Sequence, residues 1–176
     1  MSVETVGGVV SAMASKVEEV ELAYGEDRPL VALASLIGAY GVSVGALSIV
    51  AKRRGRLPTR LGIADLALYA VATHKLTRIL AKDPIASPIR APFTTLTGLD
   101  GPAELHEDVR GEGWRHAVGE LVTCPFCLGQ WVGTAFVFGG MLAPRVTRAV
   151  AATFVVHAAS DVLHHAYAAL EDATST

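Results

Sequence analysis

Long apolar stretches separated by short charged clusters run through most of the chain. Residues 29–51 carry no charged side chain, and a helix of that length crosses the ~30 Å hydrocarbon core of a bilayer. Residues 125–143 and 146–170 repeat the pattern with few charges, and residues 61–81 repeat it with more. The pattern predicts an all-α fold, a polytopic membrane helical bundle of about four transmembrane helices.

Residues 61–81 differ from the other three stretches in their polar content. Four ionisable side chains lie within them: Asp65, His74, Lys75 and Arg78. Such side chains are costly at membrane depth, so they face the interior of a bundle rather than lipid. We therefore expect the other helices to surround this one. The alternative is a helix that lies at the membrane surface.

Basic residues gather in the two short connections between predicted spans: Lys52, Arg53, Arg54, Arg56, Arg60, Arg145 and Arg148. Short loops rich in lysine and arginine stay on the cytoplasmic side of a membrane. Both connections fall on that side if the chain crosses four times, and both acidic termini and residues 82–123 then lie outside. We therefore predict a multi-pass protein of the bacterial cytoplasmic (inner) membrane, N-out and C-out.

Two polar segments accompany the predicted spans. Residues 1–28 are mainly acidic, with valines at helical spacing, which predicts an acidic amphipathic helix or a tail. They lack the basic region of a signal peptide, so we expect no cleaved signal. Residues 82–123 are rich in proline, glycine and acidic residues. A connection of this length is either functional or disordered, and we expect an irregular outer segment.

The composition agrees with a membrane protein and limits its partners. The chain is 51% hydrophobic and only 18% charged, against about 25% charged in soluble domains. Its net charge of −2 excludes the basic footprint of a nucleic-acid binder. Two G-x-x-x-G spacings, Gly41 with Gly45 and Gly129 with Gly133, predict close helix contacts. The expected partners are the lipid bilayer and either further copies of the chain or another membrane protein.

Two intramembrane ion pairs follow from the predicted topology. At ~1.5 Å per residue, Lys75 and Asp161 lie about 21 Å and 22 Å from the inner ends of their helices, so we expect them to pair. Asp65 and Arg148 lie near the inner ends and form a second expected pair. The pairs either hold the bundle together or belong to a proton or ion relay. Histidines that could carry protons or bind a metal follow on the last helix: His157, His164 and His165.

Cys124 and Cys127 are the only cysteines, and with Pro125 they open the third predicted span. A helix N-terminus favours a thiolate, and the oxidising outer side permits a disulfide. Three interpretations stay open: a structural disulfide or static cap, a redox-active dithiol, or a metal site. A metal site needs further ligands, because two cysteines alone cannot close a tetrahedral zinc site. The candidates are His106, His116 and Glu120.

Several strings resemble a bacterial membrane-protein family known as domain of unknown function 1360. The most specific is Cys124-Pro125-Phe126-Cys127-Leu128-Gly129-Gln130-Trp131. Weaker ones are Asp65-Leu66, Lys75-Leu76-x-Arg78, Lys82-Asp83 and the segment Ser87-Pro88-Ile89-Arg90-Ala91-Pro92-Phe93. The resemblance implies a multi-spanning membrane protein without an established activity. Relatives in spore-forming bacteria and in actinobacterial phages imply, by analogy, a spore-envelope or lysis-associated role.

Residues 82–123 could fold back over the bundle and bring an outer cluster of Arg78, Arg90 and Glu120 to the cysteines, with Arg90 pairing with Glu120. No motif fixes a reaction, and no cofactor is predicted. Our first functional hypothesis is a structural or accessory subunit that binds a membrane partner. The alternatives are an extracytoplasmic-facing thiol redox protein and a small transporter, proton-conducting or holin-like pore-forming bundle.

Overall fold

The fold consists almost entirely of helices, and the predicted all-α class is confirmed. The computed structural model describes residues 15–17, 19–20, 23–24, 28–57, 61–101 and 104–174, so most of the expected N-terminal helix or tail lies outside the described residues. The helices are α2 (Leu30–Arg53), α3 (Ile63–Lys82), α4 (Ser87–Arg90), α5 (Gly113–Thr123), α6 (Pro125–Leu142) and α7 (Pro144–Thr174), with a 3-10 turn η1 (Pro84–Ala86) before α4.

Three of the helices are long and apolar enough to cross a membrane: α2, α6 and α7. They correspond to the predicted spans 29–51, 125–143 and 146–170. The remaining predicted span, residues 61–81, forms helix α3 but is not among the three. Its charged side chains explain the difference: Asp65, Lys75, Arg78 and Lys82. That α3 crosses the membrane therefore stays a prediction.

Prolines and one glycine set where the long helices begin and end. Cys124 is extended (φ −102°, ψ 107°), as expected before a proline, and Pro125 occupies the first turn of α6, where its missing N–H is not needed. Pro144 opens α7 in the same way. After α2, Gly55 takes a positive φ of 62°, which ends the helix at little steric cost.

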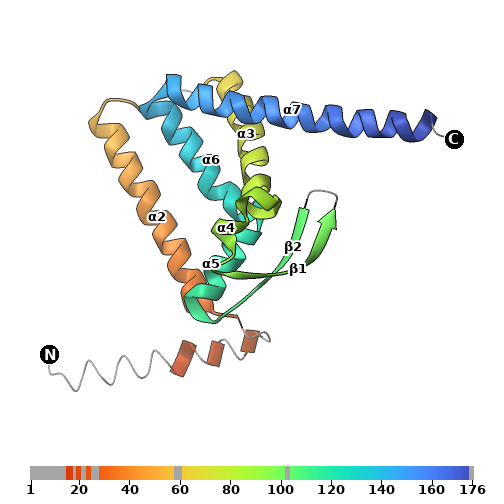
Figure 1. Ribbon diagram of the computed structural model, residues 1–176. Helices are drawn as coiled ribbons and strands as arrows, with labels where there is room; N and C mark the ends of the chain where they lie inside the picture. The colour runs from red at the N-terminus through yellow and green to blue at the C-terminus, as the bar shows by residue number, and fades with distance from the viewer. Residues whose placement is uncertain are drawn as a thin grey trace, which may run out of the picture.

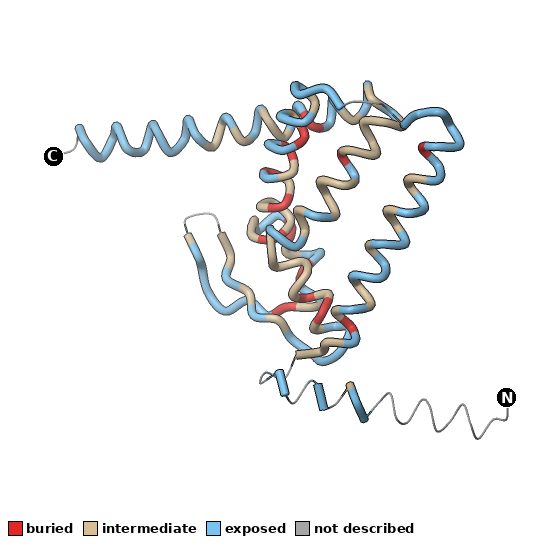
Figure 2. Tube along the Cα trace, turned by 180° about the vertical axis from the view of Figure 1, so that it is seen from behind, coloured by how far each residue is buried: buried red, intermediate tan, exposed pale blue. Residues whose placement is uncertain are grey.

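Helix α3 lies at the centre and packs against α6 and α7. The core cluster contains Tyr69 and Ala72 of α3, Phe136 of α6 and Ala151 of α7. The Tyr69 and Phe136 rings stack with centroids 5.9 Å apart, and Phe154 meets Phe136 edge to face at 6.5 Å. Figure 2 shows buried residues concentrated along this central helix, whereas α2 and the end of α7 are mainly exposed.

The two ends of the bundle differ in charge. The connection between α2 and α3 and the turn between α6 and α7 lie at one end (Figure 1). We call it the basic end because it carries Lys52, Arg53, Arg54, Arg56, Arg145 and Arg148. Helix α7 runs from this end obliquely to α2 and α6, and its carboxyl-terminal part extends away from the other helices. Residues 162–174 are all exposed.

The outer segment, residues 82–123, lies at the opposite end (Figure 1). The prediction that it is irregular is wrong. It contains an antiparallel hairpin of β1 (Thr94–Gly101) and β2 (Glu104–Val109), followed by α5. The strand pairing runs from Thr94 opposite Val109 to Gly101 opposite Glu104, with two irregularities in register. Strand β2 and helix α5 contact α3, so this segment folds back onto the bundle.

Candidate functional site

Cys124 and Cys127 lie where α5 ends and α6 begins. Cys124 is the N-cap of α6. Its Sγ atom accepts a hydrogen bond from the backbone N–H of Cys127 over 3.2 Å. Both thiols are free; Cys124 is half-buried and Cys127 is exposed. The disulfide, one of the three interpretations of this pair, is not formed in this structure, where the Cys124 sulfur caps α6.

An apolar cavity of about 350 Å³ lies beside Cys127, between α2, α5 and α6. Tyr40 of α2 and Trp131 of α6 line it and meet edge to face, with ring centroids 5.3 Å apart. The hydroxyls of Tyr40 and Thr134 share a hydrogen bond of 2.8 Å. Glu120 contributes the carboxylate of the cavity wall. The exposed thiol thus borders a largely apolar space rather than a ring of polar ligands.

The structure does not assemble the candidate metal ligands: Cys124, Cys127, His116, His157 and His165. Among the residues that it describes, no group of three or more histidine, cysteine or acidic side chains could hold a metal ion. His116 Nε2 lies 3.2 Å from a Glu120 oxygen, and His157 Nε2 lies 3.9 Å from an Asp161 oxygen. These are pairs, whereas a structural zinc site needs four ligands.

The structure brings together the charged residues that the topology paired. Lys75 Nζ lies 2.6 Å from Asp161 Oδ2 and links α3 to α7. The Lys75 side chain is 10% exposed and that of Asp161 is 39% exposed. Arg148 donates two hydrogen bonds to Asp65, from Nε to Oδ1 over 2.8 Å and from Nη2 to Oδ2 over 2.7 Å. Both pairs join the same two helices, so they fix the position of α7 along α3.

The members of the predicted outer cluster each find a different partner. Arg78 pairs with Glu104 of β2, and Glu120 pairs with Arg28 and contacts His116. The predicted pairing of Arg90 with Glu120 is wrong. Arg90 pairs with Glu107 instead, because the hairpin brings β2 over α4 while Glu120 lies on α5.

Arg90 is fully buried and makes a network at the centre of the outer segment. Its Nε and Nη2 atoms donate to the two Glu107 oxygens over 2.8 Å and 3.0 Å. Its Nη1 atom donates to the backbone carbonyls of Leu80 and Asp83 over 2.8 Å and 3.1 Å. The Thr94 hydroxyl donates to Glu107 over 2.9 Å. One side chain therefore ties β2 to the end of α3.

Two carboxylates of the hairpin have lowered pKa values. Burial by itself raises the pKa of Glu107, but hydrogen bonds from Arg90 and Thr94 outweigh it and hold the pKa below its ordinary value. Hydrogen bonds from Lys82 (2.6 Å) and His106 (2.7 Å) lower the pKa of Asp100. The hairpin is thus attached to the bundle by charged hydrogen bonds.

Residues 68–167 match the family described as Protein of unknown function (DUF1360), which covers more than half of the chain. The chain belongs to this family. The DUF1360 match runs from α3 to α7, so it includes the outer segment, the two cysteines and the Lys75–Asp161 pair, and it leaves out α2.

One curated relative of this DUF1360 protein is Sporulation protein YjcA of Bacillus subtilis (strain 168). It is 33% identical over 69 residues, which is 38% of this chain and 58% of the relative. The chain thus spans less than two thirds of the relative's length. No solved structure matches the chain.

Within the DUF1360 region, sequence reasoning missed Glu107, Glu104 and Asp100 as partners of the basic residues. A signal for the hairpin was present. The β-branched run Thr94, Thr95 and Thr97 is typical of a strand, and Asp100-Gly101-Pro102 is typical of a turn. Together they predict a hairpin in which Asp100 ends the first strand and Glu104 and Glu107 lie on the second.

Proposed function

We propose that this chain is a small integral protein of the bacterial cytoplasmic membrane, where it acts as a structural or accessory subunit that binds a membrane partner. The observation that carries the proposal is how little of its apolar helices the chain itself buries. In the most apolar 18-residue windows of α2 and α6, 6% of the residues are buried, and in that of α7 11% are. Apolar surface left in water is unfavourable by ~25 cal/mol per Å², and a bilayer removes it from water.

The distribution of charge supports the proposed orientation. The basic end lies opposite the outer segment (Figure 1), as the positive-inside rule requires if the basic end is cytoplasmic. This orientation puts the start of α2 and the hairpin outside, and the proposed C-out terminus requires α7 to cross the bilayer as the fourth span. With α3 as the remaining span, its side chains Lys75 and Asp65 pair with Asp161 and Arg148 of α7, as intramembrane charges do.

Small residues on α2 support the proposed partner. A Cβ atom added at Gly38, Gly41 or Gly45 would meet nothing within 4 Å, so this face of α2 has space for another helix. Gly133 of α6 already allows such a close helix contact, because a Cβ atom added there would lie 3.7 Å from Thr73 of α3. Small residues allow such close approach in membranes. We propose that a further copy of the chain or another membrane protein packs on α2.

The similarity to Sporulation protein YjcA supports a role for this subunit in the cell envelope during sporulation.

Membrane insertion and orientation are tested together. Reporter fusions after residues 56 and 110 should report a cytoplasmic and an extracytoplasmic position, and the chain should stay in the pellet after alkaline carbonate extraction. Release by carbonate would overturn membrane insertion. An extracytoplasmic reporter at residue 56 would overturn the orientation.

Partner binding is tested on the glycine face of α2. Gly41→Ile should abolish chemical crosslinking of the chain to its membrane partner, because the added side chain keeps the helices apart. Ala39→Ile is the matched control, since Ala39 is exposed on α2 but lies away from the glycine face. Equal crosslinking for both variants would reject α2 as the binding face.

A second candidate function is a thiol redox protein, favoured by the free thiols at the start of α6. The Cys127 backbone N–H donates a hydrogen bond to the Cys124 sulfur, so the two cysteines lie within one helical turn of each other, as a reversible disulfide requires. Alkylation of cells with a mass-tagged maleimide should then reveal a reversible disulfide that forms and is reduced in vivo. A permanently reduced pair, or an intact phenotype for Cys124→Ser, would exclude this candidate.

A further inference from the structure

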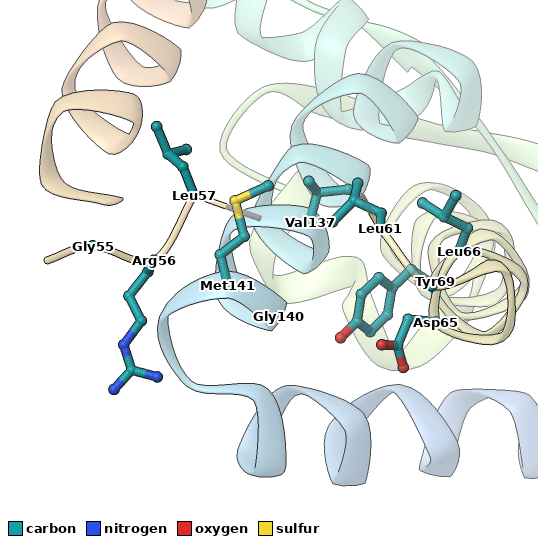
Figure 3. A pocket seen from close by; sticks show the side chains of 11 residues that line it. Gly55, Arg56, Leu57, Leu61, Asp65, Leu66, Tyr69, Val137, Gly140 and Met141 are labelled. Atoms are coloured by element: carbon teal, nitrogen blue, oxygen red, sulfur yellow. The ribbon is translucent and has the colours of Figure 1, made fainter. Parts of the chain in front are cut away.

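A cavity of about 340 Å³ opens at the basic end, between the α2–α3 connection, α3 and α6 (Figure 3). About half of its wall is apolar, and five apolar side chains line it: Leu57, Leu61, Leu66, Val137 and Met141. Arg56 lies at one side of the cavity, and Asp65 and Tyr69 of α3 lie at the other, with Met141 and Val137 of α6 between them (Figure 3). The cavity therefore combines a long apolar wall with a charged rim.

The rim has a positive charge available to a ligand. The carboxylate of Asp65 is already bound by Arg148 through two hydrogen bonds of 2.8 Å and 2.7 Å, so its charge is compensated. Arg56 is exposed, and no carboxylate in the described part of the chain forms an ion pair with it. The exposed residues Lys52, Arg53 and Arg54 lie just before it in the chain. An anion is thus attracted to this side of the cavity.

We propose that this cavity binds an anionic phospholipid of the cytoplasmic leaflet, an inference that rests on the proposed membrane function. The phosphate lies at Arg56, whose guanidinium is suited to phosphate oxygens. The first part of an acyl chain lies against Leu61, Val137 and Met141. Basic pockets between helices on the cytoplasmic side are the sites where anionic headgroups bind. A free phosphate shares the headgroup chemistry but makes no use of the apolar wall.

The test measures lipid binding to the purified full chain by native mass spectrometry in detergent. Phosphatidylglycerol and phosphatidylcholine with identical acyl chains are compared, and inorganic phosphate is added as a competitor. We expect tighter binding of phosphatidylglycerol, and a roughly fivefold loss of its affinity in Arg56→Gln. Arg54→Gln is the matched control: it removes the same charge two positions away, at a residue that does not line the cavity, and should change the affinity less.

A second variant examines the apolar wall. Val137→Phe fills part of the cavity and should weaken both lipids, while leaving the preference for phosphatidylglycerol unchanged; its thermal stability is checked in parallel. Equal binding of the two lipids by the wild type would overturn the proposal. Equal losses of phosphatidylglycerol affinity in Arg54→Gln and Arg56→Gln would also overturn it, because they would indicate attraction to the positive surface as a whole. Displacement of the lipid by millimolar phosphate would overturn it as well.

Failure of this inference is distinguishable from failure of the proposed function. If the chain resists carbonate extraction but shows no lipid preference, only the lipid site is rejected. If carbonate releases the chain, the proposed membrane insertion is rejected.

Discussion

The outer segment and the apolar helices bury opposite kinds of side chain. In the polar outer segment, Arg90 is the largest fully buried side chain of the described residues, with 0% exposure. On the apolar helix α2, Ile37 and Val42 are each 74% exposed. A soluble domain shows the reverse arrangement. The difference indicates that the two regions fold against different surroundings, water for the outer segment and lipid or a partner helix for α2.

Hydrogen bonding explains how the outer segment tolerates a buried charge. A buried arginine is destabilising unless each donor has an acceptor, and here Glu107 and the Leu80 and Asp83 carbonyls accept from Arg90. The helices need no such network for stability in lipid, because their backbone groups bond internally. Four changes break or sharpen this comparison, from the largest expected effect to the smallest.

Arg90→Met should have the largest effect, a loss of about 3–5 kcal/mol in the stability of the outer segment. It leaves Glu107 buried with an unpaired charge and removes the donors to the Leu80 and Asp83 carbonyls. Limited proteolysis in detergent, followed by mass spectrometry, should show rapid cleavage in residues 94–109 while the helices stay protected.

The double variant Arg90→Met with Glu107→Leu serves as the control for Arg90. Since it removes both charges, it should recover much of the loss. If the single variant were cut no faster than the wild type, the buried pair would not hold the hairpin in place.

Gly119→Ala should destabilise the chain by about 1–3 kcal/mol through overpacking. The added Cβ would lie 2.5 Å from Val109 Cγ1 and 3.1 Å from the Phe93 carbonyl oxygen, and the backbone cannot move aside easily. Gly129→Ala is the matched control on α6, where nothing lies within 4 Å of the added Cβ. Thermal unfolding in detergent should show a lower Tm only for Gly119→Ala, and equal Tm values would contradict the close packing of α5 on β2.

Lys75→Asp should reduce stability by roughly 1–2 kcal/mol, a modest effect because Asp161 is 39% exposed. The variant places two carboxylates together on α3 and α7. Adding Asp161→Lys restores an ion pair in the opposite sense, and it should recover part of the loss in reversible SDS unfolding. A double variant no more stable than the single one would show that the pair does not couple the helices.

The sequence predicted the helices well because apolar length alone defines them. The α6 boundary at Pro125 followed from a proline at the start of a charge-free stretch. The partners of Lys75 and Asp65 followed from equal distances along the axes of α3 and α7, which both begin at the basic end. No comparable axis orders residues 82–123, so the partner of Arg90 could not be derived in the same way.

The direction of α7 also lay beyond the sequence. Its length and hydropathy predict a span, but its oblique course (Figure 1) depends on packing at Phe154 and Ala151 against α3 and α6. The cap of α6 by Cys124 depends on the rotation of one side chain, whereas C-x-x-C spacing is equally compatible with a disulfide. Patterns of residue type thus define elements, and contacts between elements define the site.

Acidification should produce the smallest effect and confine it to the outer segment. The folded-state pKa of Glu107 lies below the ordinary value of 4.5. The stability that Glu107 adds to the outer segment is therefore fully present above pH 4.5 and is lost as the pH falls through the folded-state pKa. The stabilisation by Asp100 is likewise lost on acidification, since the pKa of Asp100 is also lowered. A protonated Glu107 still bonds to Thr94 and keeps its shape, which is why the loss is smaller than that in Arg90→Met.

Hydrogen exchange of residues 94–109, measured between about pH 6 and pH 3 and corrected for intrinsic rates, tests the acid effect. Protection of the hairpin should fall over this interval in the wild type, while protection of α6 stays constant. Glu107→Gln removes the titrating group, so its hairpin should be less protected at pH 6 and should lose less on acidification. A wild-type pH profile in Glu107→Gln would assign the acid sensitivity to the other charged groups that attach the hairpin to α3, Asp100 with Lys82 and Glu104 with Arg78.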